Sequence, residues 1–250
     1  MTPLNDSKYL KSVAPVPVWY KKLTSEDVQQ DLKEFNNKIK IIAHKYFAEW
    51  QVEVPDEKHL CKSNLPKEMY NTFQEKKTFS QINSPAIGKW HAVSTNNFLN
   101  VPEPEVMLLR DIIMNDYKQA LIDFYKSFDP LISLNTSFAE YSHELDESWI
   151  QFYKNGDYKV LHNHLRYGFN PKFENIWAGA YYIEDGKPDK YQPYAGKFSF
   201  RIRDYNYYIN PEPGLIMMWP GDILHEVHPF YGEEERVVIN FNLSTKRVIE

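Results

Sequence analysis

The sequence predicts a mainly β fold with helices (α+β), in which N-terminal helices buttress a jelly roll. Eight of the nine glycines and twelve of the eighteen tyrosines lie after residue 140. Aromatic segments separated by glycines are typical of strands and turns. The first 130 residues instead carry two long apolar patterns with steps of three and four residues, which indicate helices. We therefore expect a mostly helical region at 1–144 that packs on a β core at 145–250, together forming one compact domain.

Two long helices are expected in the first half. The first should begin near Thr24 and Ser25, which are good N-cap residues. The second should begin after Pro102 and Pro104 and end before Pro130. Each has one apolar face, formed by Val28, Leu32, Phe35, Ile39, Ile42, Tyr46 and Trp50 in the first helix and by Val106, Leu109, Ile113, Tyr117, Leu121 and Phe124 in the second.

Short segments bounded by Gly, Pro, Asn or Asp follow one another in the second half. They predict antiparallel strands at 149–153, 158–165, 176–183, 197–203, 214–219 and 236–243. Between the helices we expect a short helix around 67–76 and a strand around 89–94. So many strands within about 100 residues suit a sandwich or jelly roll. The helices would then cover the outer face of one sheet.

Composition narrows the classes of partner and compartment. The net charge of -5 lacks the strongly basic balance that attracts nucleic acid, so a nucleic-acid partner is not expected. No apolar run approaches the roughly 18 residues of a membrane span, and no apolar signal segment follows Lys8 and Lys11. The single cysteine, Cys61, cannot form an internal disulfide. We expect a cytoplasmic protein with no membrane partner. The sequence is compatible with either a monomer or a homo-oligomer.

The histidines of the second half form a candidate metal site. On a strand, His162 and His164 share one face because side chains alternate, so both imidazoles can bind one ion. The next histidines are His225 and His228, which point to opposite sides of an extended chain, so only one of them is expected as a ligand. The alternative is that His162 and His164 are ordinary polar residues on a half-exposed strand.

The last predicted strand has one apolar and one polar face. Val237, Ile239, Phe241 and Leu243 suit packing against the helices, whereas Arg236, Val238, Asn240 and Asn242 would point into a cavity. A buried guanidinium needs an anion, since an unpaired buried charge costs several kcal/mol. Its fork matches a carboxylate. The bound carboxylate could belong to a ligand or, alternatively, to an Asp or Glu of the chain.

These motifs, taken in order, resemble the iron(II)/2-oxoglutarate-dependent oxygenases, and a group among them with an H-x-H…H metal motif. The resemblance covers roughly 145–250 and extends weakly to Gly88-Lys89-Trp90-His91. It is carried by Gly156-Asp157, His162, His164, Gly179-Ala180-Tyr181-Tyr182, Gly214 to Pro220, His225 to Pro229, Glu235-Arg236 and Phe241-Asn242. It implies a double-stranded β-helix, a cupin-like jelly-roll barrel, with Fe(II) as metal and 2-oxoglutarate as cosubstrate.

The resemblance also implies roles for single residues. His162, His164 and His225 would bind Fe(II), and Arg236, eleven residues after His225, would bind the far carboxylate of 2-oxoglutarate. His225 is preferred to His228, from which Arg236 is only eight residues away. Two departures stand out from the family pattern. A histidine, His164, occupies the place of the usual carboxylate ligand.

The second departure is Val238, which stands where related enzymes often have a serine. Tyr153 or Asn240 would then supply the missing polar contact to the cosubstrate. The implied reaction is hydroxylation of a small-molecule or peptide substrate with release of succinate and CO2. We expect Tyr182 and Arg201 at the substrate mouth. The aromatic stretch 205–208 suits either that mouth or the core.

Two other functions fit parts of the pattern. A metal-binding cupin, a three-histidine dioxygenase or isomerase, would share the barrel and the histidines, but it has no need of Arg236 and wants a glutamate after His164. A non-catalytic jelly-roll binding or structural protein would use the histidines for structural zinc. Such zinc sites need four protein ligands, and only three are at hand.

Overall fold

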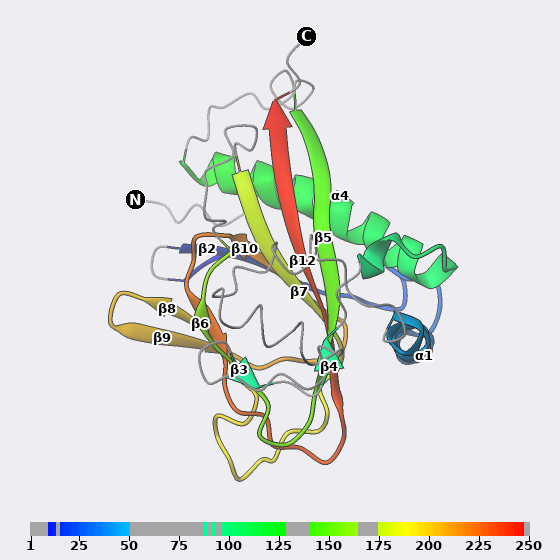
Figure 1. Cartoon of the computed structure of the whole chain (residues 1–250). Helices are drawn as coiled ribbons and strands as arrows, with labels where there is room; N and C mark the ends of the chain where they lie inside the picture. Colours follow the sequence, from blue (N-terminus) through cyan, green and yellow to red (C-terminus); the bar gives the residue numbers. More distant parts are fainter. Residues whose placement is uncertain are drawn as a thin grey trace, which may run out of the picture.

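Two antiparallel sheets packed face to face form the β core of the protein (Figure 1). The computed structural model describes residues 10–13, 16–50, 88–89, 92–93, 97–128, 141–164 and 175–247. The larger sheet has the strand order β1-β2-β10-β7-β12-β5-β4, and the smaller has β3-β6-β11-β8-β9. This confirms the predicted mainly β fold with helices.

Long strands form the centre of the larger sheet. In this sheet β12 (Arg236–Arg247) pairs along its length with β5 (Tyr141–Tyr153) and β7 (Asn175–Glu184), and β10 (Leu215–Pro220) continues the sheet beyond β7. The smaller sheet contains β6 (Tyr158–His162), β8 (Phe198–Ile202), β9 (Tyr205–Ile209) and β11 (His225–Val227). All six predicted strands are present, whereas β9 and β11 had not been predicted as strands.

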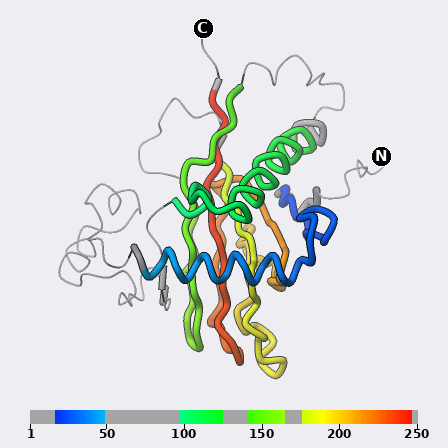
Figure 2. The backbone as a smooth tube through the Cα atoms, turned by 90° about the vertical axis from the view of Figure 1, so that its right-hand side faces the viewer, coloured from blue at the N-terminus to red at the C-terminus, as the bar shows by residue number. Residues whose placement is uncertain are grey.

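Two helices cover the outer face of the larger sheet, as predicted. Figure 2 shows α1 (Leu32–Trp50) and α4 (Pro104–Phe128) crossing the long strands on the same side. A short 3-10 helix, η2 (Phe98–Asn100), precedes α4. Their apolar faces share one buried cluster with the sheet, which includes Phe35, Ile39, Val106, Leu109, Ile113, Tyr117, Trp177, Tyr181, Ile239, Phe241 and Leu243.

The start of the first helix was predicted too early. Thr24 and Asp27 instead close a local turn, in which the Thr24 backbone N–H donates to Asp27 Oδ2 at 2.8 Å. Gln29 then adopts a φ of 54°, which a continuous helix cannot contain. The helix begins at Leu32, where Asp31 Oδ1 accepts the backbone N–H of Glu34 at 2.9 Å and caps it.

The predicted alternation of β12 is confirmed by the two buried clusters. Val237, Ile239, Phe241 and Leu243 lie in the cluster beneath the helices. Val238 lies in the second cluster, between the sheets, with residues of both: Tyr153, Ala178, Ala180, Tyr182, Phe198, Phe200, Ile202, Leu215, Met217 and Trp219. The polar face of β12 therefore points into the space between the sheets.

Part of the N-terminal region belongs to the sheets. The strands β1 (Leu10–Val13) and β2 (Val16–Lys22) extend the larger sheet through pairing of β2 with β10. The predicted strand at 89–94 appears as β3 (Gly88–Lys89) on the smaller sheet and β4 (Ala92–Val93) on the larger. The predicted helix at 67–76 lies outside the described residues. In the described part, no helix combines the length and the apolar character that a membrane crossing requires.

Candidate metal centre

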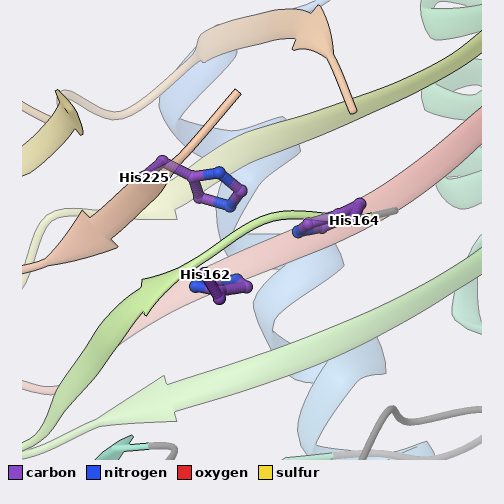
Figure 3. A group of neighbouring side chains, drawn as sticks. All are labelled: His162, His164 and His225. Carbon is purple, nitrogen blue, oxygen red and sulfur yellow. The ribbon is translucent and has the colours of Figure 1, made fainter. Parts of the chain in front are cut away.

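Three histidines converge between the two sheets. The candidate ligand atoms of His162, His164 and His225 all lie within 4.8 Å of one another. Figure 3 shows the three imidazoles gathered from β6, the residues just after it, and β11. The ring centroids of His162 and His225 are 4.2 Å apart, and those of His164 and His225 are 4.9 Å apart. Three imidazoles this close can bind one metal ion.

An irregular strand pair brings these residues together. His225 pairs with His162, whereas Val227, two residues on, pairs with Lys159, so β6 carries one extra residue between the two pairs. The strand ends at His162, short of the predicted 165. His164 lies beyond that end, where its backbone N–H donates to Gly221 O at 2.7 Å. The two histidines reach one site, but not on one regular strand.

Each histidine has a hydrogen-bond partner at Nδ1. His162 Nδ1 lies 2.8 Å from Val160 O, and His225 Nδ1 lies 2.9 Å from Ile223 O. His164 Nδ1 lies 2.5 Å from the side-chain oxygen of Asn242. A carbonyl oxygen accepts a proton, so each Nδ1 is the protonated nitrogen and each Nε2 is left for a metal. The donor set therefore fits a divalent ion of the iron type.

Burial keeps His162 and His225 neutral, which is the form that binds metal. Burial lowers the pKa of His162 well below its usual range, and the neighbouring His225, Lys159 and His164 lower it further. Burial also lowers the pKa of His225 well below that range, with His164 adding to the effect. Neutral histidines add no charge of their own, so the metal would keep its full positive charge for anionic ligands.

Aromatic side chains enclose the histidines. The ring of Phe198 is stacked on His225 with centroids 5.4 Å apart, and Trp219 meets the same histidine edge-on at 4.9 Å. Trp149 is stacked on His164 at 6.0 Å. These apolar rings pack around the imidazoles and restrict their orientation.

A buried guanidinium, that of Arg236 on β12, lies near Tyr153 and Tyr182 of the cluster between the sheets. Arg236 is 1% exposed, and its Nη1 donates to Gly196 O at 2.5 Å while Nε donates to Asp185 O at 3.3 Å. Its Nη2 has no partner among the described residues. Burial lowers the pKa of Arg236, and Tyr182 and Tyr153 oppose that shift. Within the described ranges Arg236 forms no ion pair with a carboxylate. The alternative expectation, an Asp or Glu of the chain as partner of its buried charge, is therefore not met there.

Two tyrosines lie beside this guanidinium. Tyr153 pairs directly with Arg236 across the β5–β12 ladder, and its hydroxyl donates to Gln151 Oε1 at 2.9 Å. Asn240 Nδ2 donates to the same oxygen at 2.8 Å. Burial raises the pKa of both Tyr153 and Tyr182, so both phenols stay protonated at neutral pH. Tyr182 is buried between the sheets rather than at an open rim.

Other candidate residues lie away from the histidines. Arg201 alternates with the buried Phe200 and Ile202, so it points to the outer face of the smaller sheet, where Nη1 donates to Asn206 Oδ1 at 3.3 Å. His228 lies with Ser199, 3.1 Å from its hydroxyl, and is not part of the metal cluster. The aromatic stretch 205–208 is strand β9. Some of its side chains, such as Tyr205, are exposed. Others, such as Tyr207, pack against the core between the sheets.

Some polar residues of the site had not been singled out as candidates. Gln151 holds both Tyr153 and Asn240, and its place two residues before Tyr153 on the same strand face was a usable signal. Lys159 is half-buried, and burial lowers its pKa to about 8. Its charge lowers the pKa of His162 and of His225, and its place beside the irregular pairing of β6 has no sequence signature. Glu147 is joined to His164 through Asn242.

Comparison with known proteins gives one sequence-family match. Residues 147–242 match the family described as "Putative 2OG-Fe(II) oxygenase", and this segment holds all three histidines and Arg236. No curated protein sequence matches the chain.

Solved structures resemble this chain at low sequence identity. A Pseudomonas putida prolyl-4-hydroxylase is 11% identical over 94% of this chain and 95% of its own, with a TM-score of 0.47. An oxidoreductase of the 2OG-Fe(II) oxygenase family from Burkholderia pseudomallei is 14% identical over 58% of each chain, with a TM-score of 0.38. The viral collagen prolyl hydroxylase of Paramecium Bursaria Chlorella virus-1 is 14% identical over 76% of this chain and 92% of its own, with a TM-score of 0.39.

The family match and the site fall on the same residues. The two-sheet jelly roll, the three clustered histidines and the buried arginine are parts that an oxygenase of this family can use to bind its metal and cosubstrate. The segment 147–242, which carries the three histidines and Arg236, is therefore similar to the iron(II)/2-oxoglutarate-dependent oxygenases, enzymes that use Fe(II) and 2-oxoglutarate.

Proposed function

We propose that the protein is a dioxygenase that hydroxylates its substrate and converts 2-oxoglutarate to succinate and CO2. One observation carries the proposal: three histidines converge between the sheets, and a buried guanidinium with an unpartnered Nη2 lies near Tyr153 and Tyr182 of the inter-sheet cluster. The histidines suit a divalent metal, and the guanidinium suits a carboxylate. 2-Oxoglutarate is a dicarboxylic acid, so one end could bind the metal while the carboxylate at the other end binds Arg236.

The three histidines would hold the metal through their Nε2 atoms. His162 and His225 are fixed by hydrogen bonds to backbone carbonyls, and His164 by Asn242. Three protein ligands leave coordination positions open for the cosubstrate and O2. The bound iron supplies the oxidising power for attack on a C–H bond. The protein would contribute orientation and an apolar surrounding, which Phe198 and Trp219 supply at His225.

Arg236 would bind the far carboxylate of 2-oxoglutarate. Its Nη1 and Nε already donate to backbone carbonyls, so the guanidinium is held in place and Nη2 is left to donate. Because no serine stands at Val238, protonated Tyr153 and Tyr182 are the hydroxyl donors at hand. Asn240, bonded to Gln151, would line the same cavity. For Arg201, the outward position removes the support for a place at the substrate mouth.

The alternatives account for fewer of these features. A three-histidine cupin would leave the buried Arg236 without a use. A structural zinc site would need a fourth ligand, and the described residues place only three metal-binding side chains in the cluster. The proposed substrate is a small molecule or a peptide.

Formation of succinate tests the reaction. Protein loaded with Fe(II) is incubated with ¹³C-labelled 2-oxoglutarate, O2 and a mixture of candidate metabolites and peptides, and labelled succinate is followed by NMR. We expect succinate from the wild type and at least a tenfold loss in Arg236→Gln. Arg201→Gln is the matched control, since Arg201 faces outward, and it should retain turnover.

Two results would contradict parts of the proposal. Equal turnover in Arg236→Gln and Arg201→Gln would remove Arg236 from the cosubstrate site. Iron-loaded wild type that binds no 2-oxoglutarate and forms no succinate would rule out the dioxygenase reaction.

A further inference from the structure

His164 is held differently from the other two histidines of the metal centre. His162 and His225 each use a backbone carbonyl two residues earlier in their own segment. His164 instead bonds a side chain of the opposite sheet, Asn242 on β12. It is also the residue that stands where the family resemblance places a carboxylate ligand.

A carboxylate lies one hydrogen bond further along. Asn242 Nδ2 donates to Glu147 Oε1 at 2.5 Å, and Asn242 Oδ1 lies 2.5 Å from His164 Nδ1. Glu147 and Asn242 are directly paired on neighbouring strands, β5 and β12, so the ladder itself sets this contact. Asn242 is only 5% exposed, which protects both bonds from competition with water.

The donor and acceptor pattern of this chain allows one arrangement. A carboxylate only accepts, so the amide nitrogen of Asn242 must face Glu147. The amide oxygen then faces His164 and can only accept, which places the proton on His164 Nδ1 and leaves Nε2 for the metal. Glu147 thus determines, through Asn242, which nitrogen of His164 can act as a ligand.

The same chain brings negative charge to the site. A backbone carbonyl fixes a tautomer but has no net charge, whereas Glu147 polarises the Asn242 amide toward the imidazole. Charge of this kind raises the basicity of a ligating histidine. An Asp or Glu ligand would supply its charge by direct coordination, which the neutral imidazole of His164 cannot do.

We propose that Glu147 is a positioning residue that acts through Asn242 to orient His164 and to strengthen its binding of the metal. It partly replaces, from outside the coordination shell, the carboxylate that His164 displaces. This inference rests on the proposed three-histidine metal site. Trp149, stacked on His164 at 6.0 Å, restricts the same ring from another side.

Metal affinity tests the inference without any need for substrate. Binding of Co(II) or anaerobic Fe(II) is measured by calorimetry for the wild type, Glu147→Gln and Asn242→Ala. Glu147→Gln keeps an acceptor for Asn242 and removes only the charge. We expect it to weaken binding by about 10-fold, and Asn242→Ala by between about 10-fold and 100-fold, the usual range for partners of metal ligands.

The chain offers a matched control on the same two strands. Ser244 Oγ donates to Asp146 Oδ1 at 2.8 Å, a cross-strand bond next to the Glu147–Asn242 pair. Asp146→Asn removes one negative charge there without loss of a hydrogen bond to His164. Its metal affinity should stay within about 2-fold of the wild type, and thermal unfolding of each variant verifies that the fold is intact.

Exchange of the two groups distinguishes positioning from a general structural role. In the double variant Glu147→Gln/Asn242→Asp, the new carboxylate lies directly against His164 Nδ1 and accepts from the new glutamine amide. We expect it to restore the affinity lost in Glu147→Gln. In ¹H–¹⁵N spectra of imidazole nitrogens, His164 should carry its proton on Nδ1 in the wild type and show both tautomers in Asn242→Ala.

The outcomes separate this inference from the proposed function. If the wild type binds no metal, the three-histidine centre itself is wrong. If the wild type binds and Glu147→Gln matches Asp146→Asn, or the double variant stays as weak as Glu147→Gln, the role of Glu147 is overturned.

Discussion

His225 of β11 lies directly opposite His162 of β6, with imidazole centroids 4.2 Å apart. Two metal-binding side chains are thereby positioned by the backbone hydrogen bonds of one antiparallel pair, before any metal is present. His164, just past the end of β6, depends instead on Asn242 and on the backbone contact to Gly221. The centre thus combines two ligands fixed by a sheet with a third fixed by contacts to other segments.

Metal should stabilise the folded protein, because a preformed cluster binds in the native state only. At a free metal concentration 100 times Kd, the gain in free energy of unfolding is about 2.7 kcal/mol. For a chain of this size that raises Tm by roughly 5–10 °C. Differential scanning fluorimetry with Co(II) or Mn(II) measures the shift, which chelator should reverse. His162→Ala/His164→Ala should show none, and an equal shift in that variant would place the metal elsewhere.

Gly196 should be essential for cosubstrate binding rather than for metal. A Cβ on Gly196 would lie 2.7 Å from Arg236 Cζ, and its φ of +59° already disfavours other residues. Gly196→Ala should displace the guanidinium and weaken 2-oxoglutarate binding at least tenfold, with metal affinity unchanged, as calorimetry can measure. Gly214→Ala, strained at a φ of +84° but in contact with Leu32, is the control. Equal 2-oxoglutarate affinity in the two variants would contradict this role.

Asp116 should make the protein less stable at neutral pH than in mild acid. Burial raises its pKa from 3.8 to about 6, although Lys21 lies 3.6 Å away. The native state therefore binds more protons than the unfolded state between about pH 4 and 6, and its stability falls as pH rises through that window. Asp116→Asn should remove this loss, gaining up to about 3 kcal/mol at pH 7.

Urea unfolding at pH 4.5 and pH 7 checks this prediction. Lys21 keeps its ion pair with Asp27 at 2.8 Å in the variant. Asp111→Asn, at an exposed position of the same helix, is the control and should leave the pH dependence as it is. The explanation fails if Asp116→Asn also leaves it unchanged.

Asn36 should contribute to stability without any effect on the metal. Its Nδ2 donates to Ile183 O at 3.1 Å, and the buried Tyr181 hydroxyl donates to its Oδ1, which ties α1 to β7. Asn36→Ala leaves two buried polar groups unpaired, at about 1–3 kcal/mol each. Chemical unfolding should show a loss of roughly 2–4 kcal/mol. Asn37→Ala, exposed on the same helix, should lose far less, and similar losses in the two would refute the contact's role.

The sequence was most informative where a simple period decides which face is buried. The two-residue period of β12 separated Val237 and Ile239 from Arg236 correctly, because one face lies under the helices and the other lies between the sheets. The helical period of α1 and α4 likewise identified the side chains that the larger sheet covers. The preference for His225 over His228 came from the resemblance to the oxygenases, and His225 is the one that lies with the other two histidines.

Features set by irregular backbone or by distant partners were not predictable. The extra residue in β6, between the positions of Lys159 and His162, has no signature in the sequence. The carbonyls that hold Arg236 come from Asp185 and Gly196, which are 51 and 40 residues away along the chain. Strand β2 pairs with the distant β10, and β1 joins the sheet only through β2, so a helical interpretation of the N-terminal region overlooked both.

The central claim is that His162, His164, His225 and Arg236 together bind iron and 2-oxoglutarate. Anaerobic titration of the Fe(II)-loaded protein with 2-oxoglutarate, followed by visible absorption, tests it most directly. The account predicts a weak charge-transfer band that saturates in the wild type, is absent in His162→Ala/His164→Ala, and needs far more 2-oxoglutarate in Arg236→Gln. A wild-type protein that binds Fe(II) but shows no band at saturating 2-oxoglutarate would contradict it.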